Sequence, residues 1–243
     1  MTFSSDFVTW VQPWRIFVPD EEDDGDMEFY GMGGVHARGD LLIGFVRVLR
    51  DELPCDEGSS PDGIGYTVLG WSRDGVNWTR GREPFLDRGS EPGSWDHAMV
   101  WGSSALQRGN EVLIYYGGYA RGHKIGRATE RQIGLARLPV DRYVSRDASP
   151  GGGRLVTSPI ELEGPSLTVN AEVRGEMRVR IVDEAGAPIS GCDWDDCRTI
   201  RGDSLEHRVD WAGTTPPVPE GPVRIEFQMR DTKVYGFSAH SEV

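Results

Sequence analysis

Apolar and polar residues alternate along several short segments of the chain. The runs "LTVNAEV" from Leu167, "MRVRIVD" from Met177 and "VRIEFQM" from Val223 place an apolar side chain at about every second position. That period is typical of a strand with one face in a core and the other in water. Further candidates are rich in Val, Ile, Leu and Tyr and are bounded by Gly, Pro, Asn or Asp; they are residues 41–49, 65–71, 111–116, 132–138 and 166–171. The pattern predicts an all-β protein.

A Gly-rich stretch and an internal repeat divide the chain. The stretch "RDASPGGGR", residues 146–154, predicts a boundary near Pro150, with one domain over residues 1–149 and a second over 150–243. Before it, "RGDLLIGFVRV" from Arg38 resembles "RGNEVLIYYGG" from Arg108. Each passage opens on a polar hairpin signal and continues as an apolar strand. We interpret the repeat as two copies of a four-stranded sheet.

The first copy ends in "SRDGVNW", where the sequence predicts a tight turn. Ser72 and Asp74 can accept hydrogen bonds from backbone amides, and Gly75 can adopt a positive φ. Trp78 can pack its ring beneath the turn. Turn chemistry accounts for each of these residues, so we assign the motif a structural role.

Charge and cysteine content restrict the partners. The formal net charge of −13 disfavours nucleic acid, which requires a basic face, and leaves neutral ligands such as carbohydrates open. There is no long apolar run for a membrane and no secretory signal, so we expect a cytoplasmic protein if Met1 is the true start. The three cysteines predict reduced structural thiols, although Cys192 and Cys197 could pair in an exported protein. We expect no metal ion and no cofactor, because zinc-type spacings are absent from the sequence.

Three passages resemble the five-bladed β-propeller glycosidases of glycoside hydrolase families 32 and 43. They are "SRDGVNWTR", "EVLIYYGGY" and "IGLARLPVDRYVS". Blades of these proteins carry a Ser-x-Asp-Gly-x-x-Trp ending, and the last blade closes with a segment similar to residues 134–145. A C-terminal β-sandwich follows, to which residues 155–211 are similar in order and spacing. The resemblance implies a propeller over residues 1–149 and a β-sandwich over 150–243.

The resemblance covers only the C-terminal portion of such a propeller. Two blades are expected here, with an outer strand of a third at residues 7–18. A closed propeller needs about three more blades, which implies either a truncated chain or blades supplied by a partner, with a homo-oligomer as one form of the second alternative. The first blade, which usually carries the nucleophile or base in these families, has no matching segment in this sequence.

Carboxyl groups are the candidate catalytic residues, because glycosidases place two of them across the scissile bond. Glu28 in "DMEFYGM" and Asp96 in "SWDHAMVWG" stand at what we take as equivalent positions of the repeat. Asp20 is a third candidate, since the resembling proteins carry an acid shortly before their "FYGM"-like strand. For each of the three, a solvated loop or strand-entry residue is the competing interpretation.

Aromatic and imidazole side chains near these acids are candidates for binding the sugar. They are Tyr30, Trp95, His97 and His123. The leading hypothesis is a glycoside hydrolase-like protein that acts on glycosidic bonds of carbohydrates. The alternative is a non-catalytic carbohydrate-binding or assembly module.

Overall fold

The computed structural model describes residues 1–23, 25–126, 131–164, 166–212 and 221–240, and these form strands without any helix. It follows that no described helix could cross a membrane. The chain is therefore all-β, as its alternating pattern predicts.

The chain divides into two compact units, Met1–Arg137 (unit 1) and Leu138–Val243 (unit 2). The strands are β1 (Met27–Arg38), β2 (Leu41–Arg50), β3 (Ile64–Ser72), β4 (Thr79–Arg80), β5 (Met99–Arg108), β6 (Glu111–Tyr119), β7 (Arg131–Pro139), β8 (Arg146–Ala148), β9 (Gly153–Val156), β10 (Ser166–Asp183), β11 (Ile200–Arg208) and β12 (Val223–His240).

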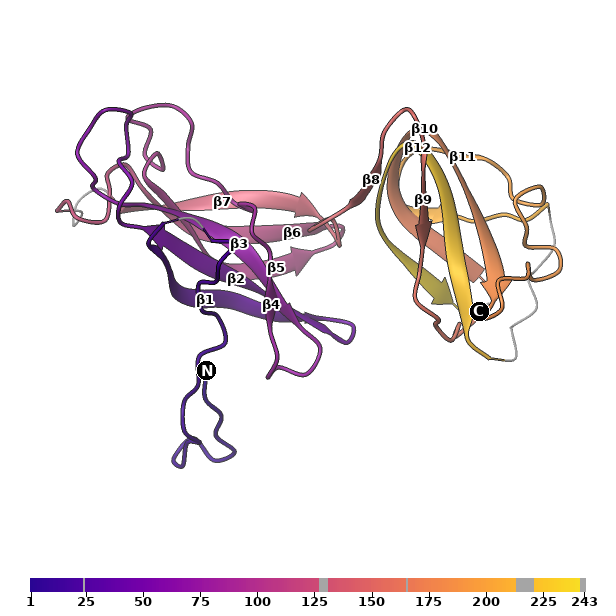
Figure 1. The fold of residues 1–243 in the computed structure, drawn as a ribbon, viewed down its shortest axis with the longest axis horizontal. Coiled ribbons are helices and arrows are strands. Elements are labelled where there is room, and N and C mark those ends of the chain that lie inside the picture. Colours follow the sequence, from indigo (N-terminus) through magenta and orange to yellow (C-terminus); the bar gives the residue numbers. More distant parts are fainter. Residues whose placement is uncertain (24, 127–130, 165, 213–220, 241–243) are drawn as a thin grey trace. The chain divides into compact units, whose positions relative to one another are not determined.

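Unit 1 contains one seven-stranded sheet in the order β1-β2-β3-β5-β6-β7, with β4 beside β3 (Figure 1). β1 to β4 pair antiparallel in sequence order, and β5 pairs antiparallel with β6. A single parallel pair, Gly65 with Met99, joins the two groups at β3 and β5. The described strands thus form two consecutive groups, β1–β4 and β5–β7, within one continuous sheet, where the repeat predicted two four-stranded sheets. The number of propeller blades stays a prediction.

The two predicted polar hairpins are confirmed. Arg38 pairs with Leu41 across the β1–β2 turn, and Arg108 pairs with Glu111 across the β5–β6 turn. In both turns the glycine at the first central position has φ near +60°. That conformation is typical of a type II′ turn and costs little only for glycine.

The turn after β3 also has the predicted chemistry. Ser72 Oγ accepts the Gly75 amide at 2.9 Å, and Asp74 Oδ1 accepts the amides of the two residues after Gly75 at 2.8 and 2.7 Å. Gly75 has φ +73°, and the Trp78 indole donates to the Gly75 carbonyl at 3.0 Å. These hydrogen bonds hold the pKa of Asp74 below its ordinary value.

The expected outer strand at residues 7–18 is not formed. The segment instead folds back on itself, with the Val11 amide bonded to the Phe3 carbonyl and the Trp14 amide to the Met1 carbonyl. Phe7 has a positive φ of 58°, which is incompatible with an extended strand. In Figure 1 the segment projects from the sheet as a loop.

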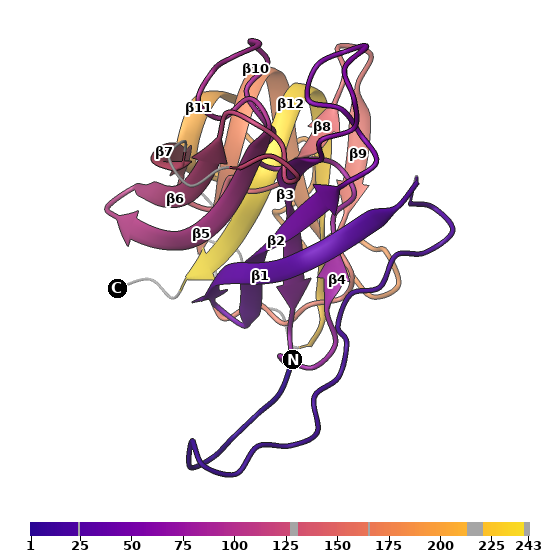
Figure 2. The same cartoon turned by 90° about the vertical axis from the view of Figure 1, so that its left-hand side faces the viewer.

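Unit 2 is built on a five-stranded sheet in the order β11-β10-β12-β8, with β9 also paired to β12. β10 and β12 bend along their length, and Figure 2 shows the curvature. Their inner faces carry the core, which includes Met177, Val179, Ile181, Ile225 and Phe227, all at most 2% exposed. The predicted break at residue 150 falls inside this unit, because β8 already pairs with β12. The two-sheet sandwich stays a prediction.

Candidate functional site

Two candidate residues lie close together in β1. Glu28 pairs with Leu49, and Tyr30 lies at the register shift between Phe29 and Gly31; both side chains are exposed, Tyr30 at 55%. The Tyr30 ring stacks on Trp101 of β5, with ring centroids 5.0 Å apart and planes inclined by 19°. The edge of His123 approaches the same ring at 5.8 Å. We call these four residues the Tyr30 face.

The support beneath Tyr30 is fixed by burial and by one hydrogen bond. Trp101 is 7% exposed, and its indole N–H donates to the Val48 carbonyl of β2 at 3.0 Å. A buried indole that has a partner cannot rotate without losing that bond. Trp101 therefore holds Tyr30 in a fixed orientation with its outer ring surface toward solvent.

His123 is positioned by the loop between β2 and β3. Its Nδ1 lies 3.1 Å from Asp51 Oδ1, and its amide donates to the Gly63 carbonyl at 3.0 Å. Lys124 adds a hydrogen bond from Nζ to the Asp51 carbonyl at 2.8 Å. The imidazole therefore has a defined place beside Tyr30, as the sequence prediction of a sugar contact requires.

The carboxylate of Glu28 differs from the other candidates in its contacts. It makes no hydrogen bond or ion pair with any residue that the structure describes. Glu28 lies near the beginning of β1, where it pairs with Leu49 of β2. Its oxygens are therefore available to a ligand that lies over Tyr30.

Asp96 lies in a second cluster, with Trp95 and Tyr116. Tyr116 Oη donates to Asp96 Oδ2 at 3.3 Å, and Ser94 Oγ lies 3.1 Å from Asp96 Oδ1. Burial, together with the negative charge of Asp96, raises the pKa of Tyr116. The Trp95 ring stacks on Tyr116 at 5.6 Å. Asp96 thus has protein partners on both oxygens, in contrast to Glu28.

Glu28 and Asp96 are not equivalent in the strand register. Glu28 pairs with Leu49 of β2, and Met99 pairs with Tyr119 of β6. Leu49 and Tyr119 lie equally far from the first residue of their strands, so Glu28 and Met99 face equivalent positions. The equivalent of Glu28 is therefore Met99, and Asp96 precedes the strand. Two register shifts in β1, against one in β5, account for one residue of this offset; the rest arises because the spacing of the acids from their hairpins was matched only loosely.

The two remaining candidates have protein partners. His97 is 5% exposed, with Nδ1 2.8 Å from the Gly89 carbonyl and Nε2 2.9 Å from Asp56 Oδ1. Asp20 accepts two hydrogen bonds from Arg82, at 3.0 and 2.9 Å, and these lower the pKa of its carboxyl. The role of His97 in sugar binding and that of Asp20 in catalysis stay predictions, and none of the contacts described here favours either role.

Of the seven predicted residues, only Glu28, Tyr30 and His123 therefore belong to the Tyr30 face. Trp101 and Asp51, which support that face, were not predicted. Trp101 stands in an apolar strand and reads as core in the sequence. Asp51 follows a strand in an acidic turn, where a carboxylate is common. No local signal distinguishes either residue.

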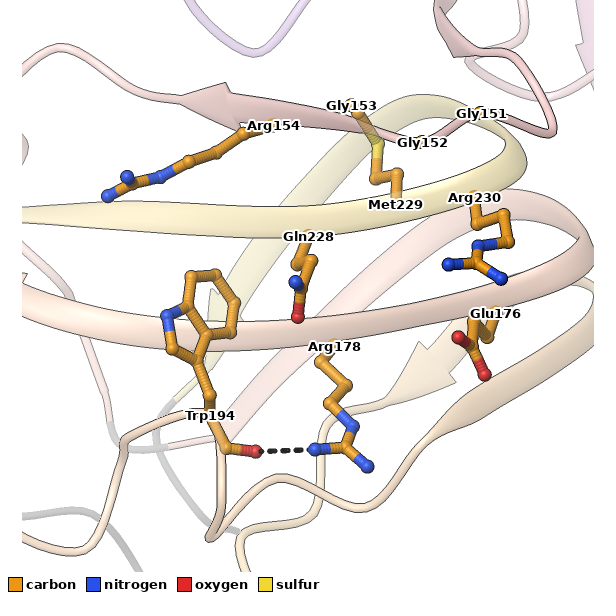
Figure 3. Close-up of a pocket in the computed structure, with 10 residues that line it drawn as sticks. All are labelled: Gly151, Gly152, Gly153, Arg154, Glu176, Arg178, Trp194, Gln228, Met229 and Arg230. Atoms are coloured by element: carbon orange, nitrogen blue, oxygen red, sulfur yellow. Dashed lines mark hydrogen bonds between the residues drawn. The ribbon is translucent and has the colours of Figure 1, made fainter.

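Unit 2 contains a cavity of about 480 Å³ that holds none of the predicted residues. Figure 3 shows Trp194, Arg178 and Gln228 in its central part, with Arg178 donating to the Trp194 carbonyl at 3.4 Å. Glu176 and Arg230 lie at one end of it in this view. The charged side chains of the lining are three arginines and one glutamate, and the glycines, Trp194 and Met229 contribute apolar surface.

Comparison with known proteins gives weak likenesses. No family model matches the chain, and no curated protein matches it. Three solved structures show partial similarity. All three are glycoside hydrolases. A "Glycoside hydrolase" has a TM-score of 0.39 and 19% identity over 56% of this chain, which spans only 34% of that protein.

The other two structures belong to glycoside hydrolase families 43 and 32. One is an arabinoxylan arabinofuranohydrolase from Bacillus subtilis, with a TM-score of 0.23, 11% identity, and coverage of 86% of this chain and 53% of that one. The other is the Bombyx mori β-fructofuranosidase BmSUC1, with a TM-score of 0.28, 9% identity, and coverage of 87% and 80%. Similarity at this level does not determine an activity.

Proposed function

We propose that the chain is a glycoside hydrolase-like protein that binds a carbohydrate on the Tyr30 face and acts on its glycosidic bond. One observation carries the proposal: the exposed Tyr30 ring stacks on a fixed Trp101 and lies two residues from Glu28, whose carboxylate bonds to none of the described residues. An aromatic ring offers a flat apolar surface to the C–H face of a sugar, and a carboxylate accepts hydrogen bonds from its hydroxyls.

Glu28 is the carboxyl group proposed to act on the bond. As an acid it would donate a proton to the leaving oxygen, and as a carboxylate it would orient a sugar hydroxyl. His123, fixed by Asp51, would contact a hydroxyl at the edge of the Tyr30 ring. The resemblance of "SRDGVNWTR" and "IGLARLPVDRYVS" to propeller glycosidases supports carbohydrate as the ligand class.

Hydrolysis needs a second carboxyl group, and Asp96 is engaged by Tyr116 and Ser94. This observation favours the second candidate function, carbohydrate binding without hydrolysis. In the catalytic version, the second carboxyl would come from blades outside this sequence or from a partner, including another copy of the chain. The two versions share the Tyr30 face and differ only in whether a bond is broken.

Binding is tested first, with calorimetric titration of arabino-, xylo- and fructo-oligosaccharides. Tyr30→Ala removes the outer ring, and we expect the affinity to fall about two- to tenfold, as for an aromatic contact of about 0.5–1.5 kcal/mol. Tyr115→Ala is the matched control, because Tyr115 is an exposed tyrosine of β6 at 39%. Equal affinities of the two variants, or no binding of any sugar by the unmodified chain, would reject the proposal.

Hydrolysis is tested with aryl glycosides and Glu28→Gln. Loss of turnover with retained binding assigns the chemistry to Glu28. Binding without turnover by the unmodified chain selects the non-catalytic version. If Glu28→Gln changes neither binding nor turnover, Glu28 has no part in the function and the proposed site is wrong.

A further inference from the structure

Two adjacent metal-binding side chains and a third that is distant in the sequence meet in unit 1. Cys55 and Asp56 lie in the loop after β2, and His97 lies just before β5, 41 positions beyond Asp56. Their ligand atoms, Cys55 Sγ, Asp56 Oδ1 and His97 Nε2, all lie within 4.8 Å of one another. Adjacent ligands and one distant histidine form no recognisable spacing motif, so this set could not be predicted from the sequence.

The surroundings of His97 provide a second, independent observation. The ring is buried, and each of its nitrogens faces an acceptor: the Gly89 carbonyl at Nδ1 and the Asp56 carboxylate at Nε2. When the single N–H of a neutral imidazole is on Nδ1 and donates to the Gly89 carbonyl, Nε2 keeps a lone pair on the side of Asp56. A metal ion beside Asp56 would bind that lone pair, with the ring held in place by the Gly89 carbonyl.

The backbone around these residues is held in place by further contacts. Arg88 Nη1 donates to the Cys55 carbonyl at 2.9 Å and to the His97 carbonyl at 3.0 Å, which ties the two loops together. Asp62 Oδ1 accepts the Cys55 amide at 2.7 Å. The Gly89 carbonyl orients the imidazole in the manner of an outer-shell partner of a metal-bound histidine.

We propose that Cys55, Asp56 and His97 bind a divalent transition metal ion of the zinc type. A thiolate and an imidazole select borderline-soft metals such as Zn²⁺ over Ca²⁺ or Mg²⁺, which prefer oxygen ligands. Tetrahedral Zn²⁺ with bonds of about 2.0–2.3 Å places its donors about 3.3–3.8 Å apart. The 2.9 Å between His97 Nε2 and Asp56 Oδ1 and the 4.8 Å limit for the whole set lie on either side of that spacing, so metal binding would adjust both separations.

The charges in the site are consistent with a divalent ion. The Cys55 thiolate and the Asp56 carboxylate together neutralise two positive charges, so the loaded site adds no net charge beside Arg88. Asp56 has a side chain that is 56% exposed, which leaves one side open to water as a fourth ligand. The ion would join the loop after β2 to the start of β5 and so stabilise unit 1.

Cobalt(II) is the probe for ligand identity, used with tag-free reduced protein. We expect thiolate-to-cobalt charge-transfer absorption in the near ultraviolet, together with the intense visible bands of tetrahedral cobalt. Cys55→Ala should abolish the charge-transfer absorption. Cys192→Ala, which removes a buried thiol of unit 2, is the control and should leave it unchanged.

Zinc affinity, measured by competition with a chromophoric chelator, tests the other two ligands. His97→Gln and Asp56→Ala should each weaken binding more than about 100-fold, beyond the 10–100-fold loss that follows removal of an outer-shell partner. The exposed Asp56 provides a variant that does not disturb the core. An absent cobalt spectrum, or a spectrum lost in Cys192→Ala and kept in Cys55→Ala, would show that His97 and Asp56 form an ordinary hydrogen-bonded pair.

Discussion

A buried ion network in unit 2 gives a prediction whose size follows from the contacts. Glu226 of β12 is 5% exposed and faces Arg180 of β10 and Arg154 of β9. Arg180 Nε donates to Glu226 Oε2 at 2.6 Å, and Arg154 donates to the same oxygen. The single carboxylate therefore joins three strands. Glu226→Gln keeps the shape of the side chain and removes its charge.

The expected cost comes from two charge-assisted hydrogen bonds. Each such bond contributes about 1.5–3 kcal/mol, and glutamine keeps one neutral acceptor in place. Arg154 is half exposed, at 53%, so water compensates for part of its loss. Arg180 keeps Asp193 as a partner at 3.2 Å. We therefore expect the unfolding free energy of unit 2 to fall by about 2–4 kcal/mol, or its melting temperature by roughly 8–20 °C.

The pH dependence provides a second measure of the same network. Burial by itself would raise the pKa of Glu226, but the hydrogen bonds and charges of Arg154 and Arg180 outweigh it and lower the pKa below its ordinary value. A depressed folded-state pKa means that the stabilisation is present at neutral pH and disappears as the pH falls through that value. The difference between the original chain and Glu226→Gln should therefore shrink in acid.

The assay is chemical denaturation followed by tryptophan fluorescence and by circular dichroism, because two units can unfold in separate steps. Glu176→Gln is the control: its ion pair with Arg201 is solvent-exposed on both sides, at 47% and 62%, and should contribute less than about 1 kcal/mol. If Glu226→Gln costs no more than Glu176→Gln at neutral pH, the network does not stabilise the fold and the reasoning fails.

Two further predictions concern the turn after β3 and the thiols. Gly75→Ala forces a side chain into a positive φ and should destabilise unit 1 by about 1–2 kcal/mol, whereas Gly126→Ala, at an unstrained and open position, should be neutral in the same denaturation series. Burial raises the pKa of Cys192 to about 11 and also raises the pKa values of Cys55 and Cys197. Cys192 and Cys197 should react with Ellman's reagent only on unfolding, and rapid labelling of these two residues in the native Cys55→Ala variant would contradict their burial.

Local chemistry explains what the sequence predicted well. The turn after β3 is specified within seven residues, because Ser72 and Asp74 bond to amides two or three positions away. The Arg-Gly hairpins are specified in the same way by Gly39 and Gly109. Such motifs need no knowledge of distant strands, so a sequence pattern is sufficient to locate them.

Bulges explain where strand predictions were inaccurate. The sequence predicts two strands, 166–171 and 177–182, separated by the polar "EVRGE", but the structure has one strand, β10. A register shift between Val173 and Glu176 lets β10 continue through the polar stretch. At Gly175 a Cβ would lie 2.3 Å from the Arg230 carbonyl, so glycine permits the close approach. A glycine in a bulge has the same sequence signal as one in a turn.

The candidate site depends on contacts that no local pattern encodes, and this is why only part of it was predicted. Tyr30 meets Trp101, and His97 meets Asp56, across separations set by how β5 packs against β1, β2 and the loop after it. Amino-acid type identified Tyr30 and Glu28 as candidates, but only the structure shows that Tyr30, at a register shift of β1, stacks on Trp101. Residue type selects candidates, and strand pairing decides which of them meet.

The two proposals for unit 1 can fail independently, because different contacts support them. Tyr30 rests on Trp101, whose indole is held by the Val48 carbonyl within the sheet. The proposed metal ligands Cys55 and His97 are instead joined by loop contacts through Arg88. Loss of the metal would remove a link between loops while the stacked rings keep their support from the strands. Sugar binding that persists in Asp56→Ala would therefore leave the carbohydrate proposal intact, and zinc binding that persists in Tyr30→Ala would leave the metal proposal intact.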